Sequence, residues 1–187
     1  MSDAAQLTLR EARAAFYRRH GFPLDGGADA QRWMPFACRD LKVHLPNFKW
    51  RRHALPLHDL HHAITGYAFS PQGEFEMAAW EFAAGRYPHL SSTLFCLPLV
   101  SMGAAVIPKR TFAAFVRGRH SRTLYCEGDL DALLDKPLRD AQLKCLPAGN
   151  VRAGYRDWGA FLALVAASTL VVSTPFALIA AALLLWR

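Results

Sequence analysis

The sequence predicts an all-α protein in which a compact helical domain carries one transmembrane helix at its C-terminal end. Three observations predict this fold class. Residues 159–186 form a run of 28 residues without an acidic or basic side chain. Helix start and stop signals recur along the preceding part of the chain. No stretch alternates between apolar and polar residues for long enough to predict a sheet.

The uncharged run is typical of a membrane-spanning helix, because about 20 apolar residues cross the hydrocarbon core of a bilayer. Trp158 and Trp186 flank the run, as interfacial tryptophans do. Pro175 lies inside it and would kink a helix, but two pieces divided there would each be too short to cross. We therefore expect a head domain over residues 1–157 and a single-pass anchor over residues 158–187.

The charge distribution predicts the orientation and the surroundings of the head. All acidic residues and all basic residues except Arg187 precede the run, which gives the head a net charge of +6. Lys144, Arg152 and Arg156 lie on the head side, so the positive-inside rule places the head in the cytoplasm. A basic head favours anionic membrane lipid as a partner. No nucleic-acid-binding motif is present, and we expect no nucleic-acid partner.

Local signals place several helices in the head. Residues 6–20 are expected to form a first amphipathic helix that ends at Gly21. Residues 31–55 mix aromatic residues with prolines, and no secondary structure can be assigned to them from the sequence. A further helix is expected over residues 90–106. Two or three shorter helices are expected over residues 109–118 and 129–146, with Pro137 breaking the last stretch. The segment 90–106 is unusually apolar, and we expect a buried helix or a wall of a lipid pocket rather than a second span.

Two proline positions predict the helices around the most polar segment of the head. Pro56 is expected to open a helix that runs to about Gly66. Ser70 followed by Pro71 is a helix cap with proline at the first helical position, and the helix that it opens is expected to stop at Gly85.

These two helices hold the residues best suited to chemistry, in the stretch LPLHDLHHAITGYAFSPQGEFE. His58 and His62 are four residues apart, so they share a helix face and can hold one metal ion. Asp59 lies three residues before His62 and can reach the same point, and Glu74 can supply a second carboxylate from the next helix. Two imidazoles and two carboxylates suit zinc, ferrous iron or manganese. His61 points elsewhere on the helix, and either supports the ligands from behind or is exposed.

Two other histidine patterns compete with this interpretation. The HDLHH segment matches the HxxHH box of membrane desaturases, but those di-iron enzymes need several boxes and several spans. Zinc peptidases need a glutamate directly after the first histidine to act as general base. Asp59 occupies that position here and is better suited to ligation, so a metal-dependent hydrolase is an alternative that the pattern does not favour.

His58, Asp59 and His62, then eleven residues, then Glu74, form the pattern HDxxH(x11)E, which resembles the signature of the ubiquinone (coenzyme Q) biosynthesis protein 4 family. The resemblance covers about residues 40–145 and is most specific over 54–84. It implies an all-helical, membrane-associated protein that binds long prenyl chains. It also implies removal of the ring carboxylate of a polyprenylated hydroxybenzoate with replacement by hydroxyl, a lyase or oxidative decarboxylase reaction.

The same resemblance implies that His58, Asp59, His62 and Glu74 are the catalytic metal ligands, with zinc as the usual metal, and that other ubiquinone-biosynthesis enzymes are partners. The chain departs from the family in being shorter and in adding its own membrane helix, so the substrate could be a different membrane-borne lipid or quinone precursor. A non-catalytic, prenyl-lipid-binding organiser of the biosynthetic complex is the alternative, and a homo-oligomer is left open. Candidates to attract a substrate carboxylate are Lys49, Arg51, Arg52, Arg117 and Arg119.

Overall fold

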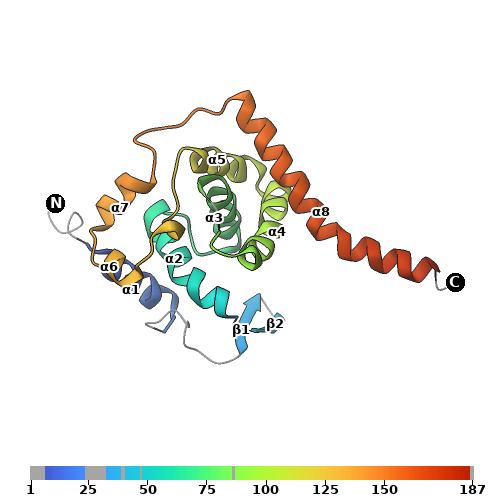
Figure 1. Ribbon diagram of the computed structural model, residues 1–187, viewed down its shortest axis with the longest axis horizontal. Coiled ribbons are helices and arrows are strands. Elements are labelled where there is room, and N and C mark those ends of the chain that lie inside the picture. The colour runs from blue at the N-terminus through green and yellow to red at the C-terminus, as the bar shows by residue number, and fades with distance from the viewer. Residues whose placement is uncertain (1–6, 24–32, 39–40, 47, 86, 186–187) are drawn as a thin grey trace. The chain divides into compact units, whose positions relative to one another are not determined.

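A computed structural model describes residues 7–23, 33–38, 41–46, 48–85 and 87–185 of the chain (Figure 1). The fold class predicted from the sequence is confirmed, because helices dominate these ranges. The chain divides into two compact units. The first unit consists of Met1–Gly66 and Leu124–Cys145, and the second consists of Tyr67–Thr123 and Leu146–Arg187.

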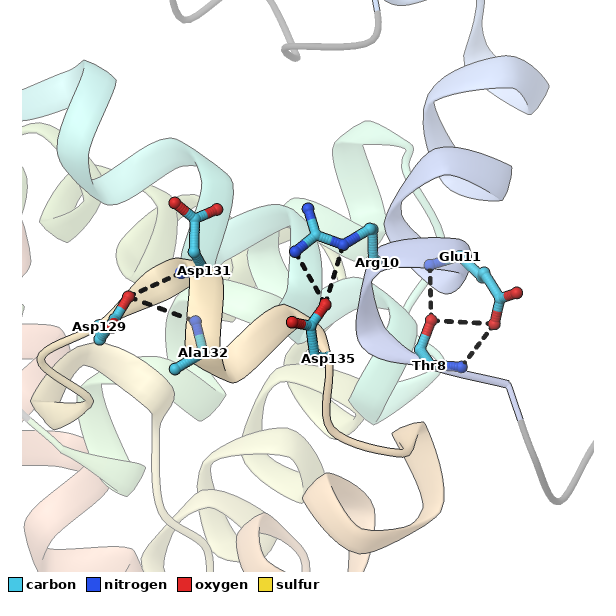
Figure 2. Close-up of polar contacts among 7 residues, drawn as sticks. All are labelled: Thr8, Arg10, Glu11, Asp129, Asp131, Ala132 and Asp135. Atoms are coloured by element: carbon cyan, nitrogen blue, oxygen red, sulfur yellow. Dashed lines mark hydrogen bonds and ion pairs between the residues drawn. The ribbon is translucent and has the colours of Figure 1, made fainter.

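The first unit is built around α1 (Leu9–His20) and α2 (Lys49–Thr65). Thr8 and Glu11 form a capping box at the start of α1, and these hydrogen bonds hold the pKa of Glu11 below its usual value (Figure 2). Arg10 forms an ion pair with Asp135 at 2.8 Å, which joins α1 to the segment after α6. The remaining elements of this unit are the short 3-10 helix η1 (Leu124–Cys126), α6 (Leu130–Leu134) and α7 (Leu138–Cys145).

A β-hairpin occupies part of the segment that the sequence left unassigned. Strand β1 (Trp33–Cys38) pairs antiparallel with β2 (Leu41–Pro46), in a register that places Trp33 opposite Pro46 and Cys38 opposite Leu41. In a two-stranded sheet both strands are edges, so prolines at positions 35 and 46 can be accommodated without a break in a central ladder. These prolines are the reason that the local pattern did not predict strands.

The helix that carries the histidines begins earlier than the sequence predicted. Helix α2 starts seven residues before Pro56, so the expectation that Pro56 opens it is wrong. Proline inside a helix removes one backbone hydrogen bond and disfavours helical conformation at the residue before it. Pro56 is buried here together with Ala54 and Leu57, and their packing offsets the lost bond. The end of α2 was predicted correctly, because Gly66 adopts a left-handed φ of 78°.

The second unit consists of four helices around one apolar core. They are α3 (Pro71–Ala84), α4 (Leu90–Val106), α5 (Pro108–Arg119) and α8 (Tyr155–Leu185). Helix α3 packs against both α4 and α5, and α8 packs against α4 (Figure 1). The core contains Met77, Ala78, Ala79, Trp80, Val100, Ala114, Phe115 and Phe161. As predicted, Ser70 caps α3 by accepting a hydrogen bond from the Gly73 N–H, and Gly85 follows its last residue.

Helix α8 has two parts with different surroundings. Its first turns belong to the core, where Trp158 stacks on Phe112 with ring centroids 3.8 Å apart and Phe161 is buried. From Leu170 onward its large apolar side chains are exposed. The helix continues through Pro175 without a break, which agrees with the prediction of one helix rather than a hairpin. Among the described residues, it is the one helix long and apolar enough to cross a membrane, with a mean hydropathy of 2.1.

The close packing of α3 against α5 can be tested by a substitution at Gly118 on α5. A Cβ added at Gly118 would overlap the carbonyl oxygen of Trp80 and lie 2.8 Å from the Ala83 Cβ. Gly118→Ala should therefore lower the free energy of unfolding by about 1–3 kcal/mol. The direction is opposite to helix propensity, which favours alanine over glycine by about 1 kcal/mol.

Chemical denaturation of the full chain in detergent measures this effect. Gly128→Ala is the matched control, because its added Cβ would meet nothing within 4 Å. If the two variants unfold at the same denaturant concentration, α3 and α5 do not make the close contact described here.

Candidate metal centre

The face of α2 that carries His58 and His62 is the centre of the candidate site. The two imidazole rings lie edge to face, with centroids 5.0 Å apart and an interplanar angle of 86°. His62 is buried and His58 is half-buried. Spacing by one helical turn brings both rings to the same side of the helix, as the sequence predicted.

A third side chain joins these histidines. Glu74 lies in the first turn of α3, and one ligand atom from each of His58, His62 and Glu74 lies within 4.8 Å of the other two. Four ligand atoms at about 2.0–2.2 Å from zinc are about 3.3–3.6 Å apart in a tetrahedron, so a small inward movement would close the group on an ion. The donor set of two imidazoles and one carboxylate fits zinc, iron or manganese. The group can therefore hold a metal ion, and its composition does not select which one.

Asp59, the fourth predicted ligand, is not part of this group of three. Its carboxylate is buried, and Oδ2 accepts a hydrogen bond from the Tyr17 hydroxyl at 2.9 Å. A carboxylate that is held through one oxygen can still ligate through the other, as carboxylates in metal sites commonly do. The assignment of Asp59 as a ligand stays a prediction.

Two consecutive residues of α1 hold the ligand-bearing face of α2. Phe16 stacks on the His62 ring, with centroids 5.5 Å apart and an interplanar angle of 16°. Tyr17, which is fully buried, donates the hydrogen bond to Asp59. Neither residue was predicted from the sequence, because Tyr17 is 42 positions from Asp59 and no local pattern relates them. Only the packing of α1 on α2 brings them together.

His61 has a structural role that differs from those of its neighbours. It is fully buried, so the alternative that it is exposed is wrong. Its Nε2 accepts a hydrogen bond from the Leu124 backbone N–H at 2.9 Å, and its ring packs edge to face on Tyr125. An acceptor at Nε2 requires the neutral ring with its proton on Nδ1. His61 thus fastens α2 to the 3-10 helix η1.

One of the predicted carboxylate-attracting cations lies on the histidine face. Arg51 precedes His58 by seven residues and His62 by eleven, a spacing that places all three on one side of α2. Burial lowers the pKa of the Arg51 guanidinium, and the negative charge of Asp59 opposes this shift. Lys49 and Arg52 are exposed on the same helix.

The two candidate cations of α5 have partners outside the site. The Arg117 guanidinium lies over the Tyr67 ring, 5.4 Å from its centroid. Arg119 forms an ion pair with Asp157 at 2.8 Å. These contacts are stabilising contacts of the second unit. Arg51 is the stronger candidate for a role at the site because it lies on the same side of α2 as His58 and His62.

Comparison with known proteins adds no family assignment, since no family model, no curated protein and no solved structure matches this chain.

The different positions of His62 and His61 can be tested by measuring metal content. His62→Ala should sharply reduce the metal bound by the purified full chain, because it removes one of the three grouped ligand atoms. His61→Ala should retain the metal but unfold more easily by about 1–3 kcal/mol, because it leaves the Leu124 N–H without its acceptor.

His61→Gln serves as a second variant that keeps a side-chain acceptor, in case His61→Ala does not fold. Elemental analysis and thermal unfolding of each variant give the two readouts. Equal metal loss in the His61 and His62 variants would refute the ligand assignment, and full occupancy in His62→Ala would remove the site.

Removal of the hydrogen bond from Tyr17 to Asp59 tests whether Asp59 binds metal. If Asp59 is a ligand, Tyr17→Phe should weaken metal binding about 10–100-fold, because loss of a partner behind a ligand typically costs that much. Tyr87→Phe is a matched control, since it removes a similar bond of 2.7 Å from a tyrosine to the buried Glu81. Competition with a metal-binding dye measures both affinities. Equal affinity in the wild type and Tyr17→Phe would argue against ligation by Asp59.

Proposed function

We propose that this protein is a metal-dependent, membrane-anchored enzyme of ubiquinone biosynthesis. It removes the ring carboxylate of a polyprenylated hydroxybenzoate and places a hydroxyl on the same ring carbon. The observation that carries the proposal is the grouping of His58, His62 and Glu74, because these are three of the four positions of the HDxxH(x11)E signature.

The chemistry balances as an oxidation. The bond between the ring carbon and its carboxylate breaks and carbon dioxide leaves, while the oxygen of a water molecule forms the new bond to the same carbon. Dioxygen is the oxidant: it accepts the two electrons and two protons that are released and leaves as hydrogen peroxide. His58, His62 and Glu74 would hold the divalent ion, which would act as a Lewis acid toward a bound carboxylate, and iron or manganese would also be able to exchange electrons.

The protein's own residues bind and orient the reacting groups. Phe16 fixes the plane of the His62 ring, and Tyr17 fixes the Asp59 carboxylate. This support keeps the ligand face of α2 in one arrangement before substrate arrives. Arg51, on the same face, attracts the anionic carboxylate of the substrate toward the ligands.

The proposed membrane helix α8 fits a substrate that stays in the bilayer. A polyprenyl chain keeps the aromatic head group at the membrane surface, so an enzyme tethered by α8 meets it at a raised effective concentration. Lys144, Arg152 and Arg156 lie shortly before the apolar run, which supports a head on the cytoplasmic side. Other ubiquinone-biosynthesis enzymes on the same membrane are the expected partners.

A metal-dependent hydrolase is the less supported alternative. A zinc peptidase needs a mobile general base directly after the first histidine. Asp59 holds that position, and its short buried side chain is hydrogen-bonded to Tyr17. Such a carboxylate is suited to positioning or ligation rather than to activating a water.

The proposal is tested with the full chain in liposomes that contain a polyprenylated hydroxybenzoate with a labelled ring carboxylate. Release of labelled carbon dioxide, together with a hydroxylated ring, is expected, and both should disappear on chelation and in Glu74→Gln. Arg51→Gln should raise KM by about tenfold, equivalent to about 1.4 kcal/mol, with a smaller effect on kcat. The exposed neighbour variant Arg52→Gln should leave both parameters unchanged.

Substrate binding without turnover would favour the non-catalytic organiser over the enzyme. Cleavage of an ester or amide substrate in place of decarboxylation would favour the hydrolase.

A further inference from the structure

Helix α4 presents an exposed apolar stripe along one side. Its large members are Leu94, Phe95, Met102 and Val106, which are 48%, 53%, 49% and 62% exposed. Phe95, Met102 and Val106 follow Leu94 by one, eight and twelve positions. The four residues therefore lie on the same side of an α-helix. Ser92, Val100 and Gly103 are buried on the opposite side of α4. One face therefore belongs to the core and the other is exposed and apolar.

The exposed stripe differs from an ordinary surface of a globular domain. No acidic or basic side chain occurs in residues 90–108, and charge resumes at Lys109. A surface helix of a water-soluble domain carries charged or polar side chains opposite its core face. Contiguous exposed apolar surfaces of this kind mark contacts with membranes or with other proteins.

The packing of α8 decides between these two kinds of partner. The Ser168 hydroxyl of α8 donates a hydrogen bond to the Leu97 carbonyl of α4 at 2.6 Å and accepts one from the Ser101 N–H at 3.1 Å. These bonds fix the middle of α4 at the level of Ser168. Counted back from Trp186, where the uncharged run ends, about 20 residues reach residue 167. A span of that length begins beside the Ser168 contact, which brings α4 to the edge of the hydrocarbon layer.

We propose that the exposed stripe of α4 is immersed in the acyl chains of the bilayer leaflet that faces the head domain. The inference rests on the proposed crossing of the membrane by α8, and adds a second contact with lipid. With 17 residues, α4 is about 25 Å long and is too short to be a second span. It lies at the membrane surface, held to α8 by the Ser168 bonds. The second unit is then seated in the membrane through two of its helices.

Photolabelling of the full chain from inside the bilayer tests this placement. The protein is reconstituted in phosphatidylcholine vesicles in which one lipid carries a diazirine in the middle of an acyl chain, and the labelled residues are located by mass spectrometry. Labels are expected on the segments 90–107 and 169–185. Leu143 is the internal control, because it is 71% exposed on α7, a helix that also carries Arg139, Asp140 and Lys144. The label at Leu94 and Phe95 should exceed that at Leu143 by at least about tenfold, since a carbene reacts with what surrounds it.

The outcomes distinguish the lipid contact of α4 from the membrane crossing of α8. Label on 169–185 alone would overturn the lipid contact of α4 and leave the membrane helix intact. Label on α4 no stronger than at Leu143 would also overturn it. Label on neither segment would overturn the membrane crossing itself, and with it the anchored function. Phe95→Asp should reduce the α4 label by more than half while that on 169–185 is unchanged, and unaltered α4 labelling in this variant would also contradict the proposal.

Discussion

The hydrogen bond from Tyr17 to Asp59 is the contact on which the first unit depends most. A buried carboxylate without a hydrogen-bonding partner is destabilising by several kcal/mol. Asp59 is buried and directly follows His58 on α2. Tyr17 on α1 supplies the hydrogen bond that the buried carboxylate of Asp59 needs. Phe16, the residue before Tyr17, stacks on the His62 ring. Stability and ligand geometry therefore arise from one helix–helix contact.

The second unit depends on a different polar contact. In an apolar helix, a serine hydroxyl needs a partner once it leaves water, and Ser168 finds one donor and one acceptor on the α4 backbone. The Leu97 carbonyl and the Ser101 N–H lie one helical turn apart on α4. Ser168 bonds to both of them and thereby links the core of the unit to the exposed part of α8. A change at this contact would affect the packing of α4 against α8.

Local chemistry predicted most of the helices correctly. Ser70 and Pro71, Gly85 and Pro137 each act on the backbone within a few residues, and the observed ends of the helices lie close to them. The start of α2 was not predictable in this way, because Pro56 sits inside the helix and is tolerated only through its burial. The hairpin was missed for a related reason, since its strands contain proline and, within the described part of the chain, form a sheet of two strands.

The sequence by itself determined the anchor-like run, the helical class and the pair His58 and His62, because each of these depends on composition or on a spacing of one turn. Glu74 lies close enough to His62 in the chain for one sequence motif to include both residues. This motif therefore also predicted the carboxylate of the candidate site. Tertiary structure decided which neighbours hold these residues. Tyr17 meets Asp59 across 42 positions and Leu124 meets His61 across 63. No local rule relates residues so far apart, because their contact exists only after apolar helix faces have been buried against one another.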